Sequence, residues 1–141
     1  MPGEMKVEAL WQGGWRFDAL TGTGHTVVMD AAVEDEGTEA GARPMEMLLV
    51  GLAGCTGMDV VSILETMRQE VKGYRVKVTG QRRDEHPKVF TRILIEHFVQ
   101  GNVSDERLAH AIELSNEKYC SVQAMIGNVA KIETRYEIER T

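Results

Sequence analysis

Short runs of β-forming residues occupy the first part of the chain. KVEALW, WRFDAL and HTVVMDAA lie at residues 6–11, 15–20 and 25–32, and QGG and TGTG separate them. Branched and aromatic residues favour extended backbone, and short glycine-containing segments favour tight turns between antiparallel strands. The pattern therefore predicts an N-terminal antiparallel meander of three strands.

A long segment that is apolar on every side follows the meander. The polar stretch EDEGTEAGA predicts a loop, and Pro44 after it is typical of the first turn of a helix, where its missing N–H is not needed. We expect a helix from Pro44 to about Lys72, ended by Gly73, because glycine is common just beyond a helix C-terminus. Within it, RPMEMLLVGLAGCTGMDVVSIL at residues 43–64 carries one cysteine, one aspartate and three glycines.

Alternation of period two marks the strands of the second half. Tyr74, Val76 and Val78 alternate with polar residues, RRDEHP predicts a turn, and VFTRILIEHFV predicts the partner strand of a hairpin. The last strand has the clearest pattern, with Ala130 and Ile138 at the ends of its apolar face.

A second helix is expected between the hairpin and the last strand. Ser104 is its predicted cap, and acidic residues in its first turn suit the helix dipole. The residues of its inner face are Leu108, Ala111, Ile112 and Ser115. The segment CSVQAMIGN predicts a short irregular or helical piece after it. Because strands are grouped beside strands, we predict an α+β fold with a mostly antiparallel sheet, in a single domain over residues 1–141.

The apolar helix requires cover on all of its faces, which one sheet of so short a chain does not supply. A membrane span is one alternative, but Asp59, Ser62 and the glycines weaken it, and no basic cluster flanks the segment. We predict instead an obligate homodimer in which two copies of the helix meet. The small residues that would permit close approach are Gly51, Ala53, Gly54 and Gly57.

Composition narrows the class of function. The formal net charge is −6 and no clustered basic face is apparent, which argues against nucleic acid as a partner. The N-terminal segment does not resemble a secretion signal, so we predict a cytoplasmic protein with reduced cysteines. The four histidines are scattered, and no metal or other cofactor is predicted.

The two cysteines have different predicted settings. Cys55 lies within the apolar helix, where a cysteine is commonly a small buried residue, and Asp59 one turn later would oppose formation of its thiolate. Ser121 is expected to cap the short VQAMIG turn, which would place Cys120 at a helix N-terminus close to Lys118, a setting that favours the thiolate. For each cysteine a packing role and a chemical role remain open.

Taken together, RPMEMLLVGLAGCTGMDVVSIL and the later EKYCSVQAMIG resemble the OsmC/Ohr family, the osmotically inducible and organic hydroperoxide resistance proteins. The order of elements along nearly the whole chain is similar to that family as well. The resemblance implies an OsmC-like intertwined homodimer with two sites at the subunit interface, acting as a thiol peroxidase without metal, flavin or haem. A dithiol reductant, often lipoyl-linked, would restore the enzyme.

Carried over by position, the resemblance implies that Cys55 attacks the peroxide and that Cys120 resolves the sulfenic acid as a disulfide. It implies further that an arginine and a glutamate hold the thiolate, and Arg16 and Glu46 are the candidates. The acid here comes one residue later than in the family's peroxidases, and Asp59 also departs from their pattern. In these respects the chain is more similar to the YhfA-like branch. Two functions therefore remain open: an organic hydroperoxide reductase, and a non-enzymatic dimer that binds a small apolar or sulfur-containing ligand.

Overall fold

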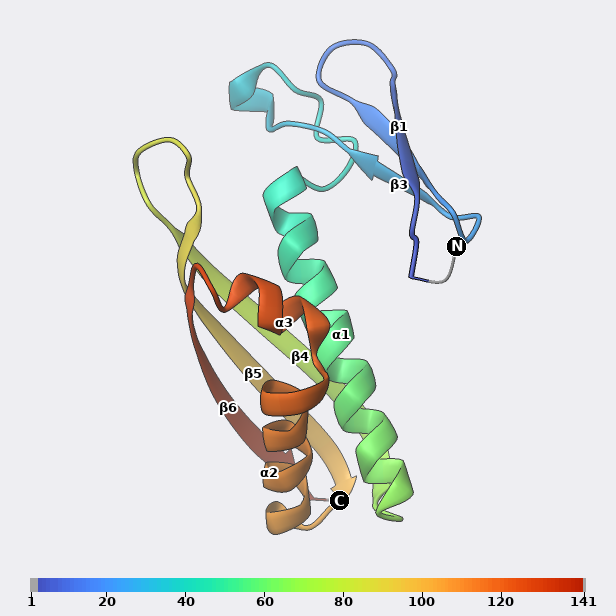
Figure 1. The fold of residues 1–141 in the computed structure, drawn as a ribbon, viewed down its shortest axis with the longest axis vertical. Coiled ribbons are helices and arrows are strands. Elements are labelled where there is room, and N and C mark those ends of the chain that lie inside the picture. The colour runs from blue at the N-terminus through green and yellow to red at the C-terminus, as the bar shows by residue number, and fades with distance from the viewer. Residues whose placement is uncertain (1–2, 141) are drawn as a thin grey trace. The chain divides into compact units, whose positions relative to one another are not determined.

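The computed structural model describes residues 3–140, which fall into two compact units, Met1–Leu48 and Leu49–Thr141. The first unit contains a small sheet and the start of the long helix, and the second contains the rest of that helix, a second sheet and two further helices (Figure 1).

The first sheet is the predicted meander. Strands β1 (Val7–Trp11), β2 (Phe17–Thr21) and β3 (Thr26–Met29) pair antiparallel in that order. A one-turn 3₁₀ helix, η1 (Val33–Asp35), follows in the loop. Of the residues in these strands only Ala19 is buried, so this sheet has little core of its own.

The long helix α1 (Pro44–Thr66) begins where the sequence predicts and ends earlier. Its start is fixed by the side chain of Glu46, whose Oε1 accepts the backbone N–H of Arg43 at 2.9 Å, as in a capping box. The predicted extension to Lys72 is wrong. Arg68 adopts a left-handed conformation, φ 59°, and the next amide, of Gln69, donates to the carbonyl of Leu64 at 2.9 Å, which ends the helix.

The second sheet contains β4 (Glu70–Arg82), β5 (Phe90–Asn102) and β6 (Lys131–Glu139) in that order. β4 and β5 form the predicted antiparallel hairpin, and β6 lies parallel to β5. Gly73 belongs to β4, at a shift in register beside Val71. The predicted α+β fold with mostly antiparallel pairing is confirmed.

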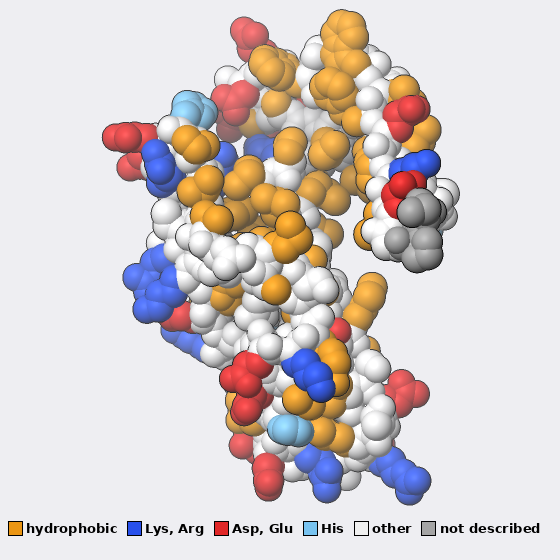
Figure 2. All heavy atoms as spheres, viewed as in Figure 1, with side chains coloured by type: hydrophobic (Ala, Val, Ile, Leu, Met, Phe, Trp, Pro, Cys, Tyr) orange, Lys and Arg blue, Asp and Glu red, His pale blue; other side chains and the backbone are white. Residues whose placement is uncertain are grey.

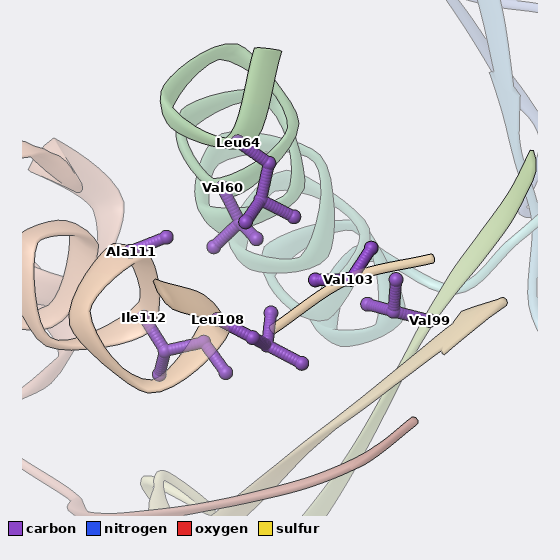
Figure 3. Packing of buried hydrophobic residues seen from close by; sticks show 7 residues of the cluster. All are labelled: Val60, Leu64, Val99, Val103, Leu108, Ala111 and Ile112. Atoms are coloured by element: carbon purple, nitrogen blue, oxygen red, sulfur yellow. The ribbon is translucent and has the colours of Figure 1, made fainter. Parts of the chain in front are cut away.

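The helices of the second unit lie on one face of this sheet (Figure 1). Ser104 caps α2 (Asp105–Leu114) by accepting the N–H of Arg107, as predicted. A π-helical turn, η2 (Ser115–Tyr119), joins α2 to the short α3 (Ser121–Ile126). Side chains from α1, α2 and the end of β5 pack into one core beneath these helices (Figure 3). Its buried members are Val60, Leu64, Val99, Val103, Leu108, Ala111 and Ile112.

Several apolar side chains of α1 stay exposed among the described residues. Its buried residues form a single stripe, Leu52, Thr56, Val60 and Leu64. On the other faces Met58 is 73% exposed and Val50 56%, and hydrophobic side chains are visible at the surface in Figure 2. By length and composition alone α1 could also cross a membrane, a property that core helices of soluble proteins share.

Candidate active site

The two cysteines meet in the second unit, together with an aspartate. The sulfurs of Cys55 and Cys120 and a carboxylate oxygen of Asp59 all lie within 4.8 Å of one another. Cys55 and Asp59 are one turn apart on α1, so the predicted common orientation of their side chains is confirmed. Cys120 comes from the junction of η2 and α3, far along the chain. The fold therefore creates a two-thiol, one-carboxylate cluster from two separate segments.

A buried hydroxyl network holds this cluster together. Ser115 and Thr56 are both fully buried, and their hydroxyls share a hydrogen bond of 2.8 Å. The Ser115 hydroxyl also lies 3.0 Å from Oδ2 of Asp59, to which it donates. Since a carboxylate only accepts hydrogen bonds, Ser115 must give its proton to Asp59 and accept from Thr56. The chain Thr56 to Ser115 to Asp59 thus fixes the carboxylate against the two thiols.

The π-helical turn brings Cys120 into this position. The amide of Cys120 donates to the carbonyl of Ser115 at 2.9 Å, five residues earlier, rather than four as in an α-helix. Such wider turns are frequent at functional sites, because they insert one residue and redirect the side chains that follow. Sequence reasoning placed Ser115 on the inner face of α2 but gave no sign of the π-helical turn.

Cys120 itself, rather than the predicted Ser121, caps α3. Its sulfur accepts the backbone N–H of Gln123 at 3.4 Å. The prediction that this setting favours the thiolate is wrong. Cys120 is only 4% exposed, and burial raises the pKa of its thiol to about 11. The amide of Gln123 opposes this rise, and Cys55 and Asp59 add to it. Cys120 is therefore a neutral thiol at physiological pH.

Asp59 forms no ion pair within the described part of its own unit. None of the ion pairs formed there includes it. Lys118, predicted to lie close to Cys120, has its ammonium 5.2 Å from the centre of the Tyr119 ring. Within its own unit, Asp59 accepts a hydrogen bond from the hydroxyl of Ser115.

A second buried polar pair belongs to the sheet. The hydroxyl of Tyr74 on β4 lies 2.6 Å from Nδ1 of His97 on β5, and the two rings stack. Burial, followed by the charge of Asp59, raises the pKa of Tyr74, and burial lowers that of His97 to about 4. Nε2 of His97 has no hydrogen-bond partner in the described part of the chain. His97 is therefore a neutral core residue.

A groove of about 700 Å³ begins at Asp59. Its walls come from α1, the end of α2 and the π-helical turn, and are largely apolar. The residues that line it are Met58, Asp59, Ser62, Ile63, Thr66, Met67, Leu114 and Tyr119. An apolar molecule in this groove would reach the carboxylate end of the cluster.

The other two predicted site residues lie in the first unit and have local partners. The guanidinium of Arg16 forms a two-pronged ion pair with Asp18, with nitrogen to oxygen distances of 2.9 and 3.2 Å. Glu46 caps α1 through the amide of Arg43. These contacts give both residues a structural role, and their predicted roles at the thiol stay predictions.

The sequence and the fold match a known family. The family model described as OsmC-like protein matches residues 35–135, so the chain belongs to the OsmC-like family. Within it, the chain is 38% identical over 135 residues to Protein YhfA of Escherichia coli K12, covering 95% of this chain and 98% of that protein. The resemblance drawn from the two cysteine motifs is confirmed.

Solved structures show the same fold. A hypothetical protein from Aquifex aeolicus VF5 is 34% identical, with a TM-score of 0.87 and 98% of each chain covered. An organic hydroperoxide resistance protein, OsmC, from Legionella pneumophila is 12% identical, with a TM-score of 0.74, 97% of this chain and 98% of that chain covered. At this level of identity the second likeness concerns the fold alone.

Proposed function

We propose that the protein is a thiol-dependent organic hydroperoxide reductase in which Cys55 and Cys120 form the reacting pair. The observation that carries this proposal is the proximity of the two sulfurs, within 4.8 Å of each other. A disulfide places its sulfurs about 2.05 Å apart, so in our proposal the two side chains move together when the bond forms. Membership of a family that includes hydroperoxide resistance proteins supports the same chemistry.

Burial suggests how the two thiols divide the work. Cys55 is half-buried, whereas Cys120 is buried and holds its proton. In our proposal the thiolate of Cys55 attacks the terminal oxygen of the peroxide. The O–O bond breaks, an alcohol leaves after taking up a proton, and Cys55 becomes a sulfenic acid. Cys120 then attacks the Cys55 sulfur, the hydroxyl leaves as water, and an external dithiol reduces the resulting disulfide.

Asp59 has a defined task in this sequence. A neutral Cys120 attacks poorly, since the thiolate is the nucleophile. The carboxylate of Asp59 lies within 4.8 Å of the Cys120 sulfur and is held by Ser115. We infer that Asp59 accepts the Cys120 proton as the sulfur attacks and passes it to the departing hydroxyl. Arg16 and Glu46 stay in the proposal in the roles that the resemblance implies.

We infer that the working form is a cytoplasmic homodimer joined through α1. The exposed apolar side chains of α1, Val50 and Met58 among them, need cover from another molecule. Gly51 and Gly54 support the inference, because a Cβ added to either would meet open space within the chain, so the chain's own packing does not require glycine there. Close approach of a second helix does require small residues at such positions.

Peroxide consumption tests the proposal directly. Purified protein with cumene hydroperoxide and dihydrolipoamide should turn over repeatedly. Cys55→Ser should abolish this activity, and Cys120→Ser should allow one turnover and leave a sulfenic acid that a dimedone probe labels. Asp59→Asn should slow disulfide closure. Its matched control is Glu113→Gln, which removes an exposed carboxylate on α2. Equal rates for the wild type and Cys55→Ser would contradict the proposal.

A second function is favoured by the groove beside Asp59. Its volume, about 700 Å³, and its apolar walls suit a small apolar or sulfur-containing ligand without any reaction. Disulfide formation separates the two functions. Stoichiometric hydroperoxide should convert both thiols of the reductase to a disulfide. A protein that only binds would keep two titratable thiols, and an apolar fluorophore should become brighter on entering its groove.

A further inference from the structure

We propose that the reduced protein binds one thiophilic divalent cation, such as Zn²⁺, through the two sulfurs of Cys55 and Cys120 and a carboxylate oxygen of Asp59. Among the described residues, this is the one group in which at least three potential metal ligands lie together. The inference concerns the reduced cluster itself and does not depend on peroxidase activity.

The geometry suits a tetrahedral metal site. Zinc binds thiolate sulfur at about 2.3 Å and carboxylate oxygen at about 2.0 Å, so its ligand atoms lie roughly 3.5–3.8 Å apart. The three atoms here are already within 4.8 Å of one another, so small side-chain movements would close the site. Two soft sulfurs and one oxygen favour zinc or cobalt over magnesium or calcium, which prefer oxygen ligands only. Three protein ligands leave a fourth position for water.

The surroundings already hold the carboxylate as metal sites require. Ligand side chains are usually oriented by hydrogen bonds from residues behind them. Here the Ser115 hydroxyl donates to Asp59 at 3.0 Å, and Thr56 fixes Ser115 at 2.8 Å. Asp59 and Cys55 are half-buried and Asp59 borders the groove, so an ion can enter from that side.

Charge favours the metal form as well. The site holds one carboxylate without a basic partner in its own unit. Binding would release a proton from each thiol. The two thiolates and the carboxylate would then carry three negative charges, and the divalent ion would reduce the net charge of the site to −1. The metal-bound and disulfide forms exclude each other, because both use the same two sulfurs. A bound ion would therefore keep the pair reduced and block attack on peroxide.

Cobalt titration of the reduced protein tests the site without any activity assay. Co²⁺ should produce a thiolate-to-metal charge-transfer band at one ion per chain, and added Zn²⁺ should abolish it, while excess Mg²⁺ should not. Cys55→Ser and Cys120→Ser should each remove the two-thiolate spectrum. Asp59→Asn should weaken binding at least tenfold, and Ser115→Ala by about tenfold. Glu113→Gln should leave the affinity unchanged.

Oxidation provides the second readout. Diamide takes two electrons from the two thiolates and is itself reduced to the hydrazine, so a disulfide forms and the metal must leave. A chromogenic chelator should then detect one Zn²⁺ released per chain. Reduction of the disulfide with a phosphine should restore the capacity to bind one Zn²⁺ per chain. A spectrum retained in both cysteine variants, or an Asp59→Asn affinity equal to that of the wild type, would overturn the proposal.

Discussion

Thr56 and Ser115, 59 positions apart in the sequence, share a hydrogen bond of 2.8 Å between fully buried hydroxyls. This contact joins α1, which carries Cys55, to the π-helical turn, which Cys120 directly follows. The distance between the two sulfurs therefore depends on a neighbouring pair of hydroxyls.

A double-mutant cycle on this pair should reveal the coupling. Thr56→Val or Ser115→Ala alone leaves a buried polar group without its partner, which should lower the free energy of unfolding by about 1–3 kcal/mol. The double variant should lose less than the sum of the two. Thr56→Ser, which keeps the hydroxyl, is the control for the hydrogen bond. Urea denaturation gives all four values, and strict additivity would show that the hydroxyls do not interact.

The buried thiol of Cys120 should react slowly with an alkylating reagent. In Cys55→Ser, the buried Cys120 should react slowly with iodoacetamide at pH 8, because its pKa lies well above the ordinary value. The rate of alkylation should increase by about tenfold for each pH unit and should still be increasing at pH 9. The same variant unfolded in urea is the control, and there the thiol should react at the ordinary rate. A plateau below pH 8 in the folded variant would contradict the argument.

His97 should make the protein less stable in mild acid. Its pKa is lowered from 6.5 to about 4 by burial, so the unfolded chain takes up a proton between these values and the folded chain does not. Stability is therefore complete above pH 6.5 and is lost as the pH falls toward 4. The loss attributable to His97 should be about 2 kcal/mol between pH 8 and pH 5.

Urea denaturation at the two pH values checks this prediction. His97→Gln should have a smaller pH dependence than the wild type, although its stability at pH 8 is lower because the bond to Tyr74 changes. His110→Gln, at an exposed position on α2, should retain the full pH dependence. If His97→Gln and the wild type lost the same amount, another group would carry the effect.

Gly51 offers a test of the proposed dimer. A leucine there meets open space within the chain and is a better helix former than glycine, so a monomer should gain up to about 1 kcal/mol. A second helix packed on this face would clash with it, and the dimer should dissociate at least tenfold more readily. Sedimentation velocity over a concentration series measures this. Glu113→Leu adds an exposed leucine on α2 and should leave assembly unchanged.

Arg68→Gly should stabilise the end of α1. Arg68 holds φ at 59°, a conformation that disfavours side chains with a Cβ and that glycine adopts freely. The gain should be about 0.5–1 kcal/mol in the free energy of unfolding, after allowing for the greater freedom of glycine in the unfolded chain. Arg107→Gly, the same exchange in the first turn of α2, should instead destabilise the protein. A loss in both variants would mean that Arg68 makes a contact worth more than its backbone strain.

The sequence predicted the elements whose pattern is local. Period two located the strands, and Ser104 with its following acids located the start of α2. The end of α1 was misjudged because Gly73 looked like a terminator, whereas a side chain at that position would press against Gln100 of the neighbouring strand. Arg68, the residue in the left-handed conformation, has no terminating character of its own.

The sequence named Cys55 and Cys120 and noted Asp59 one helical turn after Cys55, and the structure brings these three side chains together. The predicted roles of Arg16 and Glu46 stay predictions. The π-helical turn was missed, because its composition does not differ from that of an α-helix. Ser115 and Thr56 gave one usable signal, a polar residue on an otherwise apolar stripe, but their partnership spans two distant segments. The burial that keeps Cys120 protonated likewise depends on the complete fold.

Cys120 is both the proposed resolving thiol and the N-terminal cap of α3. If its sulfur joined Cys55, it would move from within 4.8 Å to about 2.05 Å of the other sulfur, and the contact with the Gln123 amide that anchors this helix of six residues would change. The exposed Met125 belongs to that helix. Oxidation at the centre of the molecule would in this way change a patch of its outer surface, where another protein could sense it.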